Sequence, residues 1–278
     1  MFPAGAKARA QLIYLLKAMA RYLRWLPADL RGRGDEGLMP PRRLSFVGRG
    51  DFERTGNEYL AHFQTLGGLQ PGDRVLDMGC GIGRMAIPLM GYLDDSGSYA
   101  GFDVGRAMIR WCQREITRRR PDFEFAWAPV YNQKYNPFGS IAAAEFRFPY
   151  EDGSFDFVFA TSLFTHLVRA ETGHYLRETA RILRPGGTCL LTFFALDEQA
   201  EREMAAGRTS FDFRHPIEGG FTTDPSQPEE AIAFAAADLR EMLTAAGLEV
   251  REPIHFGLWS NHPDAPAGQD IVVARRPA

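Results

Sequence analysis

The residues whose types and spacing most clearly indicate a ligand-binding site lie in and after a short apolar segment. Val75-Leu76-Asp77-Met78 carries an acid, Asp77, near its end and leads into three alternating glycines, Gly79, Gly81 and Gly83. Glycines at these places permit a sharp turn, a close approach of ligand to backbone and tight packing of a following helix. Dinucleotide-binding loops space their glycines differently and hold a pyrophosphate, whereas an acid before the loop suits a cationic group. We therefore expect this loop to bind a ligand that carries an amine.

A second acid lies at the end of the next predicted strand. Asp103 stands about 20 residues beyond the last glycine of the loop, where an acid commonly binds ribose hydroxyls. Both acids together indicate a nucleoside that carries an amine. A strand, an acid, a glycine loop, a helix, a strand and a second acid in this order are a far more specific signal than a lone glycine loop.

The elements that must position these residues alternate along the chain. We predict strands at 74–78, 99–103, 123–130, 155–161 and 188–196, with late strands near 249–256 and 270–274. Predicted helices cover 51–66, a stretch after Gly83, a stretch ending near Arg119, 170–183 and 228–246. This alternation is typical of an α/β fold with a parallel sheet and helices on both of its faces.

From about Leu38 to its end, the chain resembles the class I S-adenosylmethionine-dependent methyltransferases. The likeness rests on the segment VLDMGCGIGR (75–84), on GFD (101–103), on FDFV (155–158) and on LRPGG (183–187). The resemblance implies a Rossmann-like sheet of seven mostly parallel strands whose last strand is antiparallel, and S-adenosylmethionine as the cofactor. We divide the chain into an N-terminal helix with a cover segment (1–50) and a cofactor-binding methyltransferase domain (51–278).

The resemblance also assigns cofactor contacts. It implies that Asp77 and the glycine loop hold the methionine moiety and that Asp103 holds the ribose diol. Many members place an acid before a Leu-Pro-Phe stretch to bind adenine, but here Ala144 stands at that position with Glu145 beside it. The expected cofactor-binding residues are Asp77, Gly79, Cys80, Gly81, Gly83, Arg84, Asp103, Val104, Ala144, Glu145 and Thr161.

Methyl transfer needs an in-line approach of the acceptor, so positioning supplies much of the catalysis. A hydroxyl acceptor must also lose its proton. His166 follows the fourth predicted strand, at the carboxyl edge where such sheets bind ligands. If the acceptor is a hydroxyl, we predict that His166 is the general base; the open alternative is a capping or surface residue. The connection before the last helix offers His215 as a second candidate. The expected acceptor contacts are Tyr131, Asn132, Tyr135, His215 and Trp259.

The composition and charge of the chain argue against several classes of partner and of metal site. The formal net charge of −3 lacks the basic field of proteins that track phosphate backbones, so nucleic acid is a poor candidate. Cys80, Cys112 and Cys189 are far apart and match neither a disulfide framework nor a zinc site, and the sequence has no HExxH segment. We expect a metal-free enzyme in a reducing, cytoplasmic setting. The sequence carries no signal for an oligomeric state.

The N-terminal segment predicts a basic amphipathic helix followed by an irregular connection rich in Gly, Pro and Arg over residues 27–50. It lacks the run of ~20 apolar residues that spans a bilayer, and no signal-peptide pattern is present. We favour a helix that packs on the domain or covers the site over one that attaches to an anionic membrane.

Together these features predict methyl transfer to a small-molecule acceptor, such as a hydroxyl of a natural-product or sugar-like molecule. Two alternatives stay open. One is a protein or RNA methyltransferase that uses the basic N-terminal segment as a platform. The other is a non-methylating protein that binds the same cofactor on the same fold.

Overall fold

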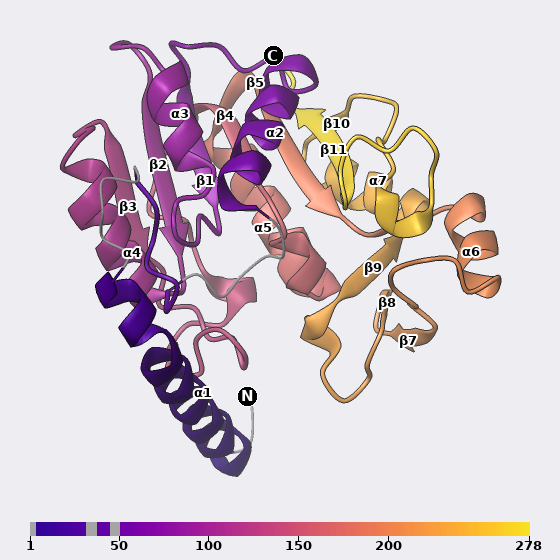
Figure 1. The fold of residues 1–278 in the computed structure, drawn as a ribbon. Coiled ribbons are helices and arrows are strands. Elements are labelled where there is room, and N and C mark those ends of the chain that lie inside the picture. Colours follow the sequence, from indigo (N-terminus) through magenta and orange to yellow (C-terminus); the bar gives the residue numbers. More distant parts are fainter. Residues whose placement is uncertain (1–3, 32–37, 45–50) are drawn as a thin grey trace.

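The computed structural model describes residues 4–31, 38–44 and 51–278. A seven-stranded sheet forms its centre, in the order β10-β11-β5-β4-β1-β2-β3 (Figure 1). β1 to β5 run parallel, and β11 is antiparallel to both β5 and β10, which confirms the predicted fold class. The strands are β1 (Arg74–Met78), β2 (Ser98–Asp103), β3 (Phe123–Trp127), β4 (Phe155–Ala160), β5 (Leu183–Phe193), β10 (Glu249–Val250) and β11 (Asp270–Arg275).

Helices cover both faces of this sheet because its central strands are apolar on both sides. Val75 and Leu76 of β1 are both fully buried but belong to different hydrophobic clusters, since neighbouring strand residues point to opposite faces. One cluster includes residues of α5 and α7, and the other includes residues of α2, α3 and α4. The helices are α2 (Phe52–Thr65), α3 (Ala86–Tyr92), α4 (Arg106–Cys112), continued by the π-helical η1 (Gln113–Thr117), α5 (Arg169–Ile182), α6 (Glu198–Ala205) and α7 (Ala236–Ala245).

A second, smaller sheet was not predicted. Its order is β6-β9-β8-β7, with β6 (Ala195–Leu196), β7 (His215–Ile217), β8 (Gly220–Thr222) and β9 (Ile232–Ala235). The prediction of a helix over 228–246 is wrong in its first half, which forms the short 3-10 turn η4 (Pro228–Glu230) and then β9. Buried residues of β9 pair with β6 and β8, and this non-local pairing overrides the helix preference of an alanine-rich segment.

Two further predicted boundaries are wrong. The strand predicted over 123–130 ends at Trp127, two residues before Pro129, which lacks the N–H that would extend a ladder. Of the strand predicted near 249–256 only β10 forms, and Pro253 follows it.

The N-terminal helix α1 (Ala4–Arg31) stands out from the rest of the molecule, at the edge where the parallel strands end (Figure 1). The amine of Lys7 donates to the carbonyl of Gly139 at 3.3 Å, and the amide of Gln11 donates to the carbonyl of Pro137 at 3.1 Å. The helix includes Pro27, so the predicted irregular connection begins later than expected; its residues 32–37 and 45–50 lie outside the described residues. In the described part of the chain, no helix has the length and apolar character to cross a bilayer.

Candidate cofactor and acceptor site

The glycine loop bends the chain sharply between β1 and α3. Gly79, Gly81 and Gly83 have φ of +78°, +53° and +77°, a region that glycine adopts without steric cost. The N–H groups of Gly79 and Cys80 both donate to the carbonyl of Phe102, at 2.9 and 3.1 Å, and so tie the loop to β2. A Cβ built on Gly81 would meet none of the described non-neighbouring atoms within 4 Å. The loop backbone therefore leaves room for a ligand there.

Asp103 ends β2 directly beside this loop. One of its carboxylate oxygens accepts the N–H of Gly81 at 2.9 Å, and the other accepts the N–H of Gly105 at 2.6 Å. Burial raises the pKa of Asp103, and these two backbone hydrogen bonds act in the opposite direction. Each carboxylate oxygen has a second lone pair, so the side chain can still accept hydrogen bonds from hydroxyl groups.

Asp77 is buried under the loop, with 1% of its surface exposed. Its Oδ2 accepts the hydroxyl of Tyr99 at 2.8 Å, while Oδ1 is a buried oxygen without a hydrogen-bond partner among the described residues. Burial raises the pKa of Asp77 to about 8, with the negative charge of Asp103 as a smaller cause. A buried acceptor left unpaired costs about 1–3 kcal/mol, and a positively charged donor would remove that cost.

The remaining predicted cofactor residues flank these groups. Cys80 is 5% exposed, and the guanidinium of Arg84 lies over the ring of Phe52. The carbonyl of Val104 accepts the indole N–H of Trp127 at 3.0 Å. Three others lie at turns: Thr161 is half-buried just after β4, and Ala144 and Glu145 are exposed on the 3-10 turn η2 (Ala143–Glu145).

A second group of polar residues forms where three separate segments meet. The 3-10 turn η3 (Phe164–His166) places Nδ1 of His166 at 2.8 Å from the backbone carbonyl of Glu229 on η4. From the loop after β3, the amide of Asn132 donates to the Glu229 carboxylate at 2.8 Å, and the ring of Tyr135 meets the His166 ring edge to face at 5.7 Å. A carbonyl only accepts, so Nδ1 carries the proton and Nε2 holds the lone pair.

Burial is the main cause that shifts the pKa values of both His166 and Glu229. It lowers the pKa of His166, as does the positive charge of Lys134, while the bond to the Glu229 carbonyl acts in the opposite direction. Burial also raises the pKa of Glu229 to about 7, and the charge of Glu171 adds to this rise. Sequence reasoning missed Glu229, because it stood inside a predicted helix and only the fold brings it to His166.

Tyr135 connects the two halves of the site. Burial is the main cause that raises its pKa, and the negative charge of Asp103 is among the smaller causes. The ring that packs against His166 is therefore also within electrostatic range of the acid at the end of β2. Tyr131, from the same loop, lies under the amine of Lys7 from α1, 5.2 Å from the ring centre.

The other two predicted acceptor residues lie elsewhere. His215 begins β7, the outer strand of the small sheet, opposite Thr222. Trp259 is 2% exposed, packs against Phe194 and Phe213, and donates its indole N–H to Asp270. The structure therefore groups Asn132 and Tyr135 near His166, places Tyr131 of the same loop against α1, and commits Trp259 to an aromatic core.

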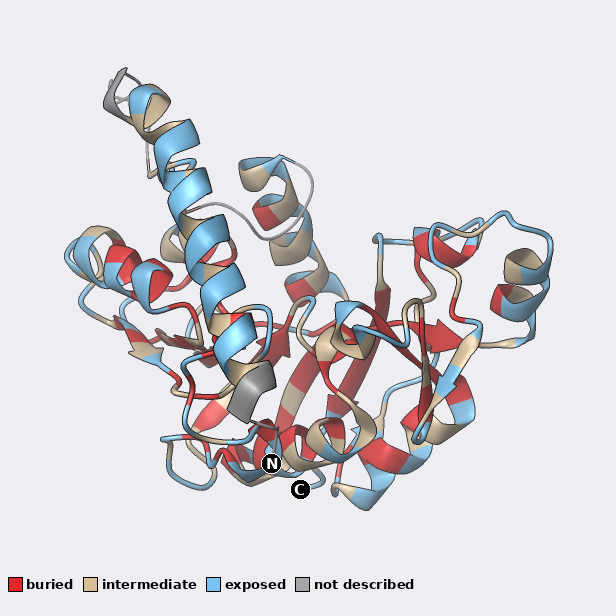
Figure 2. Cartoon of the chain, turned by 90° about the horizontal axis from the view of Figure 1, so that it is seen from below, coloured by how far each residue is buried: buried red, intermediate tan, exposed pale blue. Residues whose placement is uncertain are grey.

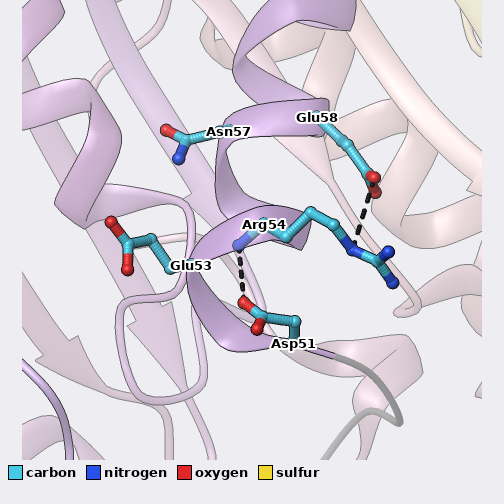
Figure 3. Close-up of a pocket in the computed structure, with 5 residues that line it drawn as sticks. All are labelled: Asp51, Glu53, Arg54, Asn57 and Glu58. Atoms are coloured by element: carbon cyan, nitrogen blue, oxygen red, sulfur yellow. Dashed lines mark hydrogen bonds and ion pairs between the residues drawn. The ribbon is translucent and has the colours of Figure 1, made fainter.

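A hollow that the sequence did not indicate lies at the start of α2 (Figure 3). Within it, the Asp51 carboxylate accepts the backbone N–H of Arg54 at 2.8 Å, and the Arg54 guanidinium faces Glu58 at 3.7 Å. Gly56 of the same helix packs on the carbonyl of Arg84, so the hollow is next to the glycine loop. The lining residues are Asp51, Glu53, Arg54, Asn57 and Glu58. The described residues include no group of three or more His, Cys, Asp or Glu side chains that could hold a metal ion.

Comparisons with known proteins agree with this geometry. A family profile described as a methyltransferase domain matches residues 76–191. The chain is 29% identical over 174 residues to a demethylmenaquinone methyltransferase of Beutenbergia cavernae, covering 63% of this chain and 61% of that protein. It is 32% identical over 150 residues to a 27-O-demethylrifamycin SV methyltransferase of Amycolatopsis mediterranei, covering 50% and 48%. Residues 76–191, which include the glycine loop, Asp103 and His166, therefore resemble an S-adenosylmethionine-dependent methyltransferase domain. The chain spans less than two thirds of the length of either relative.

The cofactor of this methyltransferase domain is S-adenosylmethionine, and the residues present fit it. The unpaired buried oxygen of Asp77 suits an ammonium group, the carboxylate of Asp103 suits a ribose diol, and the open backbone at Gly81 leaves room for the ligand. The fold itself extends over nearly the whole chain. The solved structure of the [4+2]-cyclase SpnF superposes with a TM-score of 0.53 at 19% identity, covering 97% of this chain and 96% of that one.

Proposed function

We propose that this chain transfers the methyl group of S-adenosylmethionine to a hydroxyl of a small-molecule acceptor, with His166 as the general base. The observation that carries the proposal is the meeting of two groups at one edge of the sheet, Asp103 with the glycine loop and His166 with Glu229, linked through Tyr135. The names of the two relatives support a small acceptor, since one refers to a menaquinone precursor and the other to a rifamycin.

On the cofactor side, each residue has a defined task. When bound, S-adenosylmethionine supplies a methyl group made electrophilic by its sulfonium. Asp103 accepts hydrogen bonds from the ribose hydroxyls. Asp77 forms an ion pair with the amine of the methionine moiety through its unpaired oxygen. The exposed turn with Ala144 and Glu145 provides the adenine contacts. Cys80, Arg84, Val104 and Thr161 complete the walls around the glycine loop.

On the acceptor side, Nε2 of His166 takes the proton of the acceptor hydroxyl. The bond from Nδ1–H to the Glu229 carbonyl fixes the ring orientation and stabilises the imidazolium that forms. Burial lowers the pKa of His166, so the ring is neutral and able to accept a proton at neutral pH. Asn132 holds the Glu229 side chain, and Tyr135 packs against the imidazole, so both act as positioning residues.

Residues 1–50 serve as a cover on this domain. Their helix α1 packs on the 131–139 loop, through Lys7 and Gln11, and that loop supplies Asn132 and Tyr135. Movement of α1 would therefore reach the acceptor side of the site directly.

The test incubates the purified chain with S-adenosylmethionine labelled in its methyl group and a panel of hydroxylated small molecules, with Asp103→Ala as the control. The proposal expects S-adenosylhomocysteine and a labelled product in equal amounts, both lost in the control. A changed substrate without S-adenosylhomocysteine would instead support a non-methylating enzyme. Activity on RNA or a charged protein that falls steeply with salt would support the macromolecular alternative.

A further inference from the structure

The apolar face of α1 is not covered by the rest of the protein. Leu12, Leu16, Met19 and Leu23 follow the spacing that places residues on one side of a helix. Their exposed fractions are 58%, 52%, 58% and 64%, and Leu15 beside them is 53% exposed. Helices of globular proteins normally turn such a stripe toward the core. Figure 2 shows α1 as a mostly exposed helix that extends away from the body.

Another side of α1 makes the contacts with the domain. Ala10 is buried, Gln11 donates to the Pro137 carbonyl, and Tyr14 meets Phe138 edge to face at 6.1 Å. At about 100° per residue, Ala10 and Tyr14 lie roughly opposite Leu12 around the helix axis. The side of α1 that contacts the domain is therefore opposite the apolar stripe, and the stripe faces away from the domain.

The charges on α1 have one sign. Between residues 4 and 28 the sequence has five basic residues and no acidic one; these are Lys7, Arg9, Lys17, Arg21 and Arg24. Lys17 and Arg24 are exposed, on one flank of the stripe. A leucine-rich stripe bordered by cations is the pattern of helices that lie in the surface of an anionic bilayer, with the stripe in the acyl region and the cations at the headgroups.

We propose that α1 docks this enzyme on an anionic lipid bilayer, with the stripe Leu12, Leu16, Met19 and Leu23 inserted parallel to the membrane surface. Charge complementarity favours lipid over a second copy of the chain. Symmetric pairing of two such stripes would bring two sets of cations together, which costs free energy. α1 is therefore more than a packing helix: it packs on the 131–139 loop and also presents an uncovered apolar face.

The test mixes the full chain with vesicles of phosphatidylcholine alone or of phosphatidylcholine with phosphatidylglycerol, and measures the fraction that floats with the lipid. We expect strong binding only to the anionic vesicles, weakened by salt. The variant L16Q/M19Q/L23Q should bind at least ~10-fold more weakly, because it loses burial of three large apolar side chains. The variant K17E/R24E should lose most of the preference for phosphatidylglycerol.

Leu258→Gln is the matched control, because Leu258 is 61% exposed on η5 (Leu258–Ser260), far from α1 in the sequence; it should bind vesicles as the wild type does. All variants should keep the wild-type melting temperature and affinity for S-adenosylhomocysteine, which shows that they fold. Equal binding of wild type and triple variant, or no preference for anionic vesicles, would overturn the proposal. So would a wild-type dimer that binds no vesicles and becomes a monomer in the triple variant, since a second copy would then cover the stripe.

Discussion

The imidazole of His166 carries the most specific expectation at the scale of single residues. His166→Ala should lower turnover by ~10²- to 10⁴-fold, the usual contribution of a positioned proton acceptor. Its affinity for S-adenosylhomocysteine should stay unchanged, because the glycine loop and Asp103 are untouched. Steady-state kinetics and calorimetry on the same preparation measure both. A variant within a few-fold of the wild-type rate would show that positioning alone suffices.

The pH profile gives His166 a separate signature. Burial lowers its pKa, so the rate, which needs the neutral ring, should rise through a pKa below the ordinary value of about 6.5. That limb should vanish in His166→Ala and persist in His215→Ala, the matched control from the outer strand β7. If the limb stays in His166→Ala, another group takes the proton.

Glu229 predicts a change in stability with pH. Its folded pKa is raised to about 7 from an ordinary value of 4.5, so the folded state favours the protonated acid. The stability that this proton provides is full below about pH 4.5 and is lost as pH rises through about 7. Glu229→Gln removes the ionisable group and keeps an oxygen that accepts the hydrogen bond from Asn132. Its free energy of unfolding should therefore be larger than that of the wild type by roughly 1–3 kcal/mol at pH 8. Urea unfolding at pH 5 and pH 8 measures this, with exposed Glu230→Gln as the control; equal differences at both pH values would contradict it.

The candidate site residues that the sequence indicated lie mostly in one local segment. Asp77, the alternating glycines and Asp103 form one strand-loop-helix-strand segment, whose spacing alone indicates a cofactor site. His166 could be chosen from the sequence in the same way, because it comes shortly after a predicted strand at the carboxyl edge of the sheet. Glu229 could not be found in this way, since its contact with His166 spans 63 positions along the chain. Trp259 was expected to contact the acceptor but is a buried core residue. The sequence could not separate these two roles, because an aromatic residue in an irregular segment can have either.

At the scale of elements, short strands with distant partners escaped prediction. β1 was predicted with its observed bounds, because a buried strand of a parallel sheet is a continuous apolar run bounded by turn residues. β7, β8 and β9 have three or four residues each, too few to show a period of two. Their pairing is decided by neighbours in space, and this same pairing brings η4 to His166.

The contact between α1 and the 131–139 loop yields a prediction for these two elements. Phe138→Ala removes the edge-to-face pair with Tyr14, worth about 0.5–1.5 kcal/mol beyond the buried area. Hydrogen exchange in α1 should become several-fold faster, and so should exchange in the loop. Phe211→Ala, an exposed phenylalanine of the small-sheet region, should leave both unchanged. If Phe138→Ala leaves the exchange of α1 at the wild-type rate, this pair does not hold the helix.

At the scale of the whole molecule, buried acids should make the ligand-free protein less stable as pH rises. Burial raises the pKa of Asp77 to about 8, and those of Asp270 and Glu229 to about 7. Raised acid pKa values favour the protonated folded state, so stability is lost as pH increases from about 5 to about 8. The melting temperature should fall over this range, and Asp77→Asn should reduce the fall while weakening cofactor binding. A melting temperature that rises from pH 5 to pH 8 would contradict this account.

The central claim is that the glycine loop and Asp103 form the site for S-adenosylmethionine, and calorimetric titration tests it most directly. The wild-type chain should bind S-adenosylhomocysteine and give no heat with NAD. Asp103→Ala should weaken binding by roughly 1.5–3 kcal/mol, the worth of hydrogen bonds to a charged acceptor. Tight binding of NAD without a response to S-adenosylhomocysteine, or an Asp103→Ala variant with wild-type affinity, would contradict the account.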